Sequence, residues 1–207
     1  MKVAIVACDV LKNEIEFLTK DDPDFTYREY LEFALHENPE NMRKVIIEKV
    51  NSLVGTVDSV FLGYATCQSL VGITDVLEIP TATLQGADCI DVLLGTEEYE
   101  AEKKKCSGTW FSSPGWAEQG INGLIKELHL DSVEGYDPSF FLDILFGSYQ
   151  RCLFVDPGVG NEDHFLEKSE EFADSLKLKL ECCKCGLDGI RSAISRSKVL
   201  AAEALGQ

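Results

Sequence analysis

The chain has 207 residues, 45% of them hydrophobic, which is enough to build one large domain with a sizeable core. Its 36 acidic and 19 basic residues give a formal net charge of -17, which argues against nucleic acid or an anionic membrane surface as a partner. No apolar run is long enough to span a membrane and the start lacks a secretory cleavage site, so we expect a cytoplasmic protein whose eight cysteines serve as thiols rather than disulfides.

The first half of the chain alternates between strand patterns and helix patterns. The continuous apolar run at residues 3–7 predicts a strand buried on both faces. Asp9 predicts the N-cap of a helix whose apolar face includes Phe17. Asn38 and Pro39 predict the start of another helix, at its N-cap and first position. The strands expected in this half are 3–7, 30–35, 59–64 and 81–84, with helices after Asp9, after Pro39, at 69–76 and after Asp88.

The alternation continues more loosely in the second half. The patterns predict strands at 109–111, 152–155 and 176–182, and helices at 97–105, 117–128, 139–146, 162–174 and 187–204. Right-handed crossovers between such units give a parallel sheet with helices on both faces. We therefore predict an α/β fold, a Rossmann-like and mainly parallel sheet, in a single domain over residues 1–207 with a soft boundary between two lobes near 130–150.

Three cysteines and a histidine follow successive predicted strands. They are Cys8, His36, Cys67 and Cys89. The carboxyl ends of parallel strands share one crevice, where ligands bind. Thiolate and imidazole are ligands for zinc and for iron, including iron–sulfur clusters. The sequence therefore predicts a metal ion or cluster at these residues, with zinc and iron both open. The plainer alternative is that several of these cysteines only pack in the core.

Cys89 also suits covalent catalysis. It follows Asp88 and lies in the expected first turn of a helix, where the helix dipole lowers the pKa of a thiol. A nucleophile needs a base within hydrogen-bond reach, and His36 is the histidine expected at the same edge. An enzyme with a Cys89–His36 pair and no metal is the alternative hypothesis. Tyr64, Asp88 and Trp116 are expected to line the crevice in either case.

The remaining cysteines give weaker patterns. Cys182, Cys183 and Cys185 have the spacing of metal ligands, but neighbouring residues of a strand point to opposite faces, so Cys182 and Cys183 do not easily share one ion. Cys106 and Cys152 are interpreted as packing residues.

Several short motifs, taken together, resemble the family catalogued as domain of unknown function 1638. They span most of the chain, from Cys8 to about Gly189. These motifs are Ala7-Cys8, Leu35-His36 with Pro39, Gly63-Tyr64 with Cys67, Asp88-Cys89-Ile90 with Leu93-Leu94-Gly95, and Pro114-Gly115-Trp116. One departure is that residues 85–87 lack the Arg and His that members often carry before Asp-Cys, so a role for that His is absent or moved here.

The resemblance implies a metabolic context for the protein but no particular reaction. Members occur mainly in anaerobic archaea and bacteria, often beside corrinoid methyltransferase systems, so the resemblance implies a role in corrinoid or one-carbon metabolism such as methanogenesis. We expect a metal-binding protein with a small molecule or a corrinoid methyltransferase system as partner, and a homodimer as its assembly. A non-catalytic module that receives a cofactor such as a corrinoid is the third hypothesis.

Overall fold

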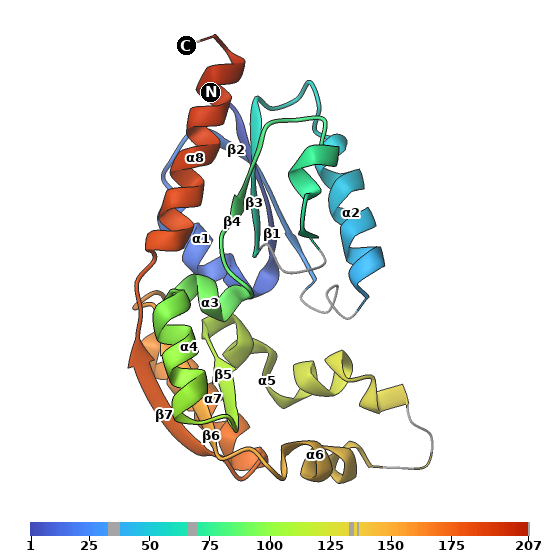
Figure 1. Cartoon of the computed structure of the whole chain (residues 1–207), viewed down its shortest axis with the longest axis vertical. Helices are drawn as coiled ribbons and strands as arrows, with labels where there is room; N and C mark the ends of the chain where they lie inside the picture. The colour runs from blue at the N-terminus through green and yellow to red at the C-terminus, as the bar shows by residue number, and fades with distance from the viewer. Residues whose placement is uncertain (33–37, 66–69, 133–134, 136, 207) are drawn as a thin grey trace.

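The computed structural model describes residues 1–32, 38–65, 70–132, 135 and 137–206 (Figure 1). In this part of the chain the strands form a four-stranded sheet in the order β2-β1-β3-β4 and a three-stranded sheet in the order β5-β6-β7. Every pairing within them is parallel. The strands are β1 (Val3–Cys8), β2 (Phe25–Leu31), β3 (Ser59–Ala65), β4 (Thr81–Leu84), β5 (Thr109–Ser112), β6 (Arg151–Asp156) and β7 (Lys179–Lys184).

Helices connect the strands, as the predicted α/β alternation requires. They are η1 (Asp9–Leu11), α1 (Lys12–Thr19), α2 (Pro39–Asn51), η4 (Ile73–Val76), α3 (Cys89–Leu94), α4 (Thr96–Lys105), α5 (Pro114–Glu127), η5 (Leu130–Ser132), α6 (Pro138–Phe146), α7 (Glu162–Ser175) and α8 (Asp188–Ala204). Figure 1 shows α2 on one face of the first sheet and α8 on the other. The Rossmann-like fold class is thus confirmed, with its strands divided between two sheets.

The hydrophobic core joins the two sheets. One buried cluster lies on the α2 face of the first sheet and includes Ile46 and Leu62. A second cluster lies on the α8 face and combines Ile5 of β1 with Val155 of β6 and Leu187. The chain leaves the first sheet after β4 and forms the second sheet. After β7 it returns to the first sheet as α8, which packs against β3 and β4. The second sheet is therefore an insertion between β4 and α8 of the first.

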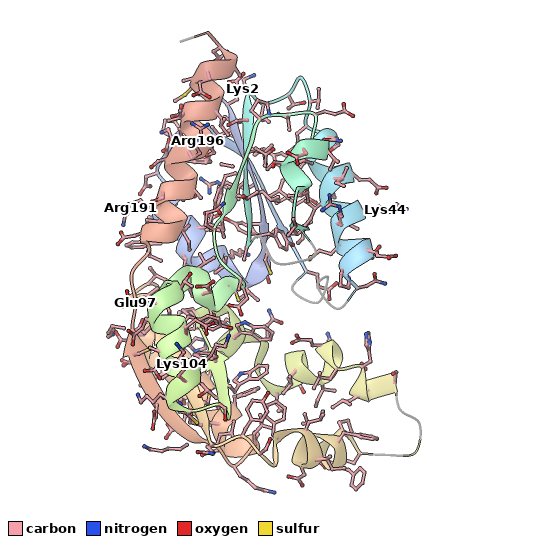
Figure 2. The ribbon with its side chains drawn as sticks, in the orientation of Figure 1. Lys2, Lys44, Glu97, Lys104, Arg191 and Arg196 are labelled. Carbon is pink, nitrogen blue, oxygen red and sulfur yellow. The ribbon has the colours of Figure 1, made fainter. Side chains whose placement is uncertain are left out.

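Charged side chains cover the outer surfaces of the helices. Figure 2 labels Lys44 on α2, Lys104 on α4, and Arg191 and Arg196 on α8, all of them exposed. The buried residues of α2 are apolar and those of α8 mostly so, whereas α4 buries Glu102, which pairs with Arg151 of β6.

Several start signals of helices are confirmed. Asn38 accepts a hydrogen bond from the Asn41 N–H at 3.0 Å, with Pro39 at the first position of α2. Asp88 caps α3 by accepting from the N–H groups of Ile90 and Asp91. Each side chain satisfies donors that a helix leaves unpaired at its N-terminus.

Two sequence expectations in the first sheet were wrong. The second strand is β2 at Phe25–Leu31, earlier than the predicted 30–35, because β2 is an edge strand whose middle residues are half-exposed and polar, such as Arg28. Asp9 does not cap a helix: it begins a 3-10 turn, and α1 starts at Lys12. That turn rotates the helix, so Phe17 is 53% exposed instead of buried.

Candidate functional site

The carboxyl ends of the two parallel sheets face each other. Gly115, just after β5, lies against the loop that follows β1, since a Cβ added to Gly115 would be 2.0 Å from the carbonyl oxygen of Val10. Val159, after β6, and Leu187, after β7, pack in the same cluster as Leu11. Parallel sheets bind ligands at this edge, so the junction is the natural place for a site.

Cys8 stands at this junction, as predicted. It is the last residue of β1 and packs against the cluster on the α2 face. Burial raises the pKa of its thiol to about 11, the Val10 N–H that donates to the sulfur partly offsets this, and the nearby Asp9 and Glu127 carboxylates raise it further. The thiol therefore stays protonated in the ligand-free protein.

Cys89 reaches the same junction from the first position of α3. It packs against the cluster on the α8 face, opposite to that of Cys8. Burial, the Asp88 carboxylate and negative charge at Cys8 raise the pKa of its thiol, while the Trp116 indole N–H donates to the sulfur and lowers it. The expected lowering by the helix dipole is thus outweighed, since α3 has only six residues and burial and the Asp88 carboxylate both raise the pKa of the thiol.

Tyr64 lies beside Cys8, at the end of β3. Its ring is buried, and its hydroxyl has no hydrogen-bond partner among the described residues. Burial and negative charge at Cys8 and Asp9 raise the pKa of the phenol, so it remains a protonated donor. The preceding Gly63 is required by packing, because a Cβ there would be 2.5 Å from the Cβ of Ala7.

Asp88 and Trp116 are also at the junction, with defined contacts. One oxygen of Asp88 caps α3 and the other accepts from the Tyr99 hydroxyl at 2.5 Å. Trp116 contacts Trp110 edge-to-face, with ring centroids 5.5 Å apart. Trp110 itself belongs to the core of the second sheet, stacked on Phe172.

Glu14 was missed by sequence reasoning. Its side chain, on α1, is fully buried, and apart from its own amide neither carboxylate oxygen has a hydrogen-bond partner in the described chain. Burial raises its pKa to about 7. A negative charge at Glu14 raises the pKa of both the Cys89 and the Cys185 thiols.

Two of the predicted ligands, His36 and Cys67, lie outside the described residues. Within the described ranges, no three His, Cys, Asp or Glu side chains gather closely enough to hold a metal ion. The described geometry brings Cys8 and Cys89 to one junction.

The other cysteines occupy the second sheet. Cys182 is exposed, whereas Cys183 and Cys185 pack against the shared core, which agrees with the alternation expected on a strand. A cavity of about 220 Å³ lies at the end of β6 and β7, lined by Phe154, Asp156, Glu162, Leu166, Cys182, Cys183 and Lys184. Lys184 pairs with Asp156 and Glu162 there, so the polar groups already satisfy one another.

Cys106 and Cys152 were interpreted as packing residues. Cys152 is fully buried in β6, and the Cys106 thiol contacts the Gln150 side chain at 3.7 Å.

A family model described as "Protein of unknown function (DUF1638)" matches residues 30–194. No curated protein and no solved structure matches the chain. Among the described helices, none has the length and apolar character needed to cross a membrane. The matched range covers the motif steps at residues 63–64, 88–90 and 114–116, which meet at the junction.

Proposed function

Because the chain belongs to the DUF1638 family, whose description names no activity, we propose its function from the junction: it binds a metal ion or iron–sulfur cluster through Cys8 and Cys89. Cys67 and His36, which follow the neighbouring strands in the sequence, would complete the donor set. The observation that supports the proposal is that two partly buried thiols, one at the end of β1 and one at the start of α3, lie at the facing carboxyl edges of the parallel sheets.

The chemistry of these residues fits a soft cation. Thiols buried among carboxylates hold their protons, and a bound cation would displace those protons and offset the repulsion that the resulting thiolates would have with Asp9 and Asp88. Sulfur ligands favour iron or zinc over calcium or magnesium. When bound, such a group would supply Lewis-acid or electron-transfer chemistry. Tyr64, kept protonated by its surroundings, would offer a hydrogen-bond donor to a small molecule beside it.

Metal analysis of protein purified without oxygen tests the proposal. We expect roughly one metal ion or cluster per chain in the wild type, and below about 0.2 in Cys8→Ser/Cys89→Ser, because dedicated thiolate ligands bind tightly. A cluster would also give a broad absorbance band near about 400 nm, while zinc would give none.

The matched control is Cys106→Ser/Cys182→Ser, which removes two thiols from the second sheet that do not face the junction. This variant should keep the wild-type metal content. Equal metal content in both double variants and in the wild type would contradict the proposal.

A cysteine nucleophile is less favoured by the site. Burial and Asp88 raise the pKa of Cys89, which reduces the thiolate that a nucleophile needs. Rapid alkylation of Cys89 below neutral pH in metal-free protein would reverse this preference. The accessory role in corrinoid or one-carbon metabolism has its own measurement: a corrinoid received at the junction should raise the melting temperature of the protein, with or without the two cysteines.

A further inference from the structure

The outer side of α6 is apolar, although it lies at the surface of the protein. Phe140, Ile144 and Leu145 are 54%, 64% and 48% exposed, and we call these three residues the α6 stripe. On the opposite side of the helix, Leu142 and Phe146 are buried in the core of the second sheet. A helix that is apolar on both sides is typical of a buried position, so the stripe has the composition of a surface that is covered.

The α6 stripe is extensive for a surface that meets only water. At these exposed fractions its three side chains present roughly 300 Å² of apolar surface, the size of patch that often marks an interaction site. Figure 1 shows α6 at the end of the molecule, on the side of the second sheet that is turned away from the first. The stripe is thus remote from the junction, and the site proposed there does not account for it.

Charge around the stripe indicates which kind of partner would cover it. The chain has 36 acidic and 19 basic residues, yet α6 contains a single charged side chain, Asp143, which pairs with Lys177 at 2.9 Å. The N-cap Asp137 accepts from the Ser139 N–H at the end of the helix. A basic partner would be drawn to the more acidic surfaces of the chain. A second copy, by contrast, meets little like charge here, and Asp143 and Lys177 offer opposite charges to their counterparts across a twofold axis.

A hollow on the same helix adds to this self-complementarity. It is a cavity of about 220 Å³ on the flank of α6 that carries Asp143, and it is lined by Leu142, Phe146, Tyr149, Leu176 and the Asp143–Lys177 pair. Apolar walls below a charged rim are typical of the pockets that hold aromatic anchor residues in protein interfaces. Each copy therefore carries both an exposed aromatic side chain, Phe140, and a hollow of the kind that receives one.

We propose that the α6 stripe is the interface of a homodimer, in which the α6 helices of two copies pack against each other about a twofold axis. The inference goes beyond the proposed function and does not depend on it. Residues four apart, such as Phe140 and Ile144, form the ridge that packs into the groove of a facing helix. Because the apolar area is small, the dimer is weak and reversible, with a dissociation constant on the order of 10 μM.

Sedimentation equilibrium of the full chain, from about 1 to about 500 μM, tests the proposal. The mass of the wild type should rise with concentration from 22.9 kDa toward twice that value. Ile144→Asp should raise the dissociation constant about 100-fold or more, because a twofold axis places the new charge in the apolar interface twice. Leu145→Asp should act in the same way, which gives a second measurement if one of the variants folds poorly.

Val199→Asp is the matched control. It makes the same kind of change at an apolar residue of α8 that is 46% exposed, and it should keep the dissociation constant of the wild type. Thermal melting followed by circular dichroism establishes that each variant is folded, since substitutions at exposed positions change stability little.

Three results would overturn the proposal. One is a wild type that stays at the monomer mass throughout the concentration range. Another is a dimer that both stripe variants retain with unchanged affinity, since its interface would then lie elsewhere. The third is a monomeric wild type that binds vesicles of neutral phosphatidylcholine and loses this binding in Ile144→Asp, which would assign the stripe to a lipid surface instead.

Discussion

Glu14 makes stability depend on pH. Its folded-state pKa of about 7 is above the ordinary value of 4.5, because burial disfavours the charged form. As pH rises from about 4.5 to about 7, the unfolded state releases this proton while the folded state retains it. The contribution of Glu14 to stability is therefore greatest below pH 4.5, the ordinary pKa, and is progressively lost as the pH rises to about 7, the folded-state pKa. The total loss is roughly 3 kcal/mol in the free energy of unfolding.

Glu14→Gln should remove that loss. We expect the variant to be more stable than the wild type at pH 8, by roughly 3 kcal/mol, with a much smaller difference at pH 4.5. Urea denaturation of metal-free protein at the two pH values measures the effect. Glu170→Gln, at an exposed position on α7, should change stability little at either pH. A difference for Glu14→Gln that is the same at both pH values would show that Glu14 does not titrate in this range.

At the residue scale, sequence reasoning placed Cys8 and Cys89 at the carboxyl edge of the strands but did not single out Glu14. The cysteines follow strands, and parallel strands end at one edge, so their location is a consequence of the pattern. Glu14 is inward because the 3-10 turn Asp9–Leu11 sets the rotation of α1, exposing Phe17 and burying Glu14 and Ile15. The sequence signals a helix here, but the turn that sets its rotation has no comparable signature.

Among the elements, α5 and the loop after β1 make the closest approach across the junction. Gly115→Ala should therefore destabilise the protein, although alanine is favoured over glycine by about 1 kcal/mol within an ordinary helix. The added Cβ would be 2.0 Å from the Val10 carbonyl oxygen, so backbone must move. We expect a loss of about 1–3 kcal/mol, as for other overpacked sites, measured by urea denaturation.

Gly186→Ala is the comparison for this change. Its added Cβ would come no closer than 3.7 Å to Asp188, an ordinary contact distance. If the two variants are equally stable, the approach of α5 to the β1 loop is less tight than described.

The elements themselves were easier to predict than their pairing. Helices with caps at Asn38 and Asp88, and the buried strands β1 and β3, follow from local patterns. The edge strand β2 did not, because half-exposed polar residues dilute its apolar signal. The division of strands between two sheets depends on which edges meet in space, and strand periodicity carries no information about that.

The whole molecule should unfold as one unit. The second sheet is inserted between β4 and α8, and both sheets share the core cluster that contains Ile5, Val155 and Leu187. Opening either part would expose that shared apolar surface, so partly unfolded forms are costly. Both tryptophans, Trp110 and Trp116, belong to the second sheet and its α5 helix, which gives that part an optical probe of its own.

We therefore expect tryptophan fluorescence, which follows the second sheet, and far-ultraviolet circular dichroism, which follows the entire chain, to give the same urea midpoint. Leu187→Ala, within the shared cluster, should lower the free energy of unfolding by about 2–5 kcal/mol and the urea midpoint with it. The transitions seen by the two probes should still coincide or begin to separate. Leu142→Ala, in the core confined to the second sheet, should cost a similar amount while the probes remain together.

A wild-type fluorescence transition that precedes the circular dichroism transition would show that the second sheet unfolds by itself. In that case the junction would be a contact between independent parts.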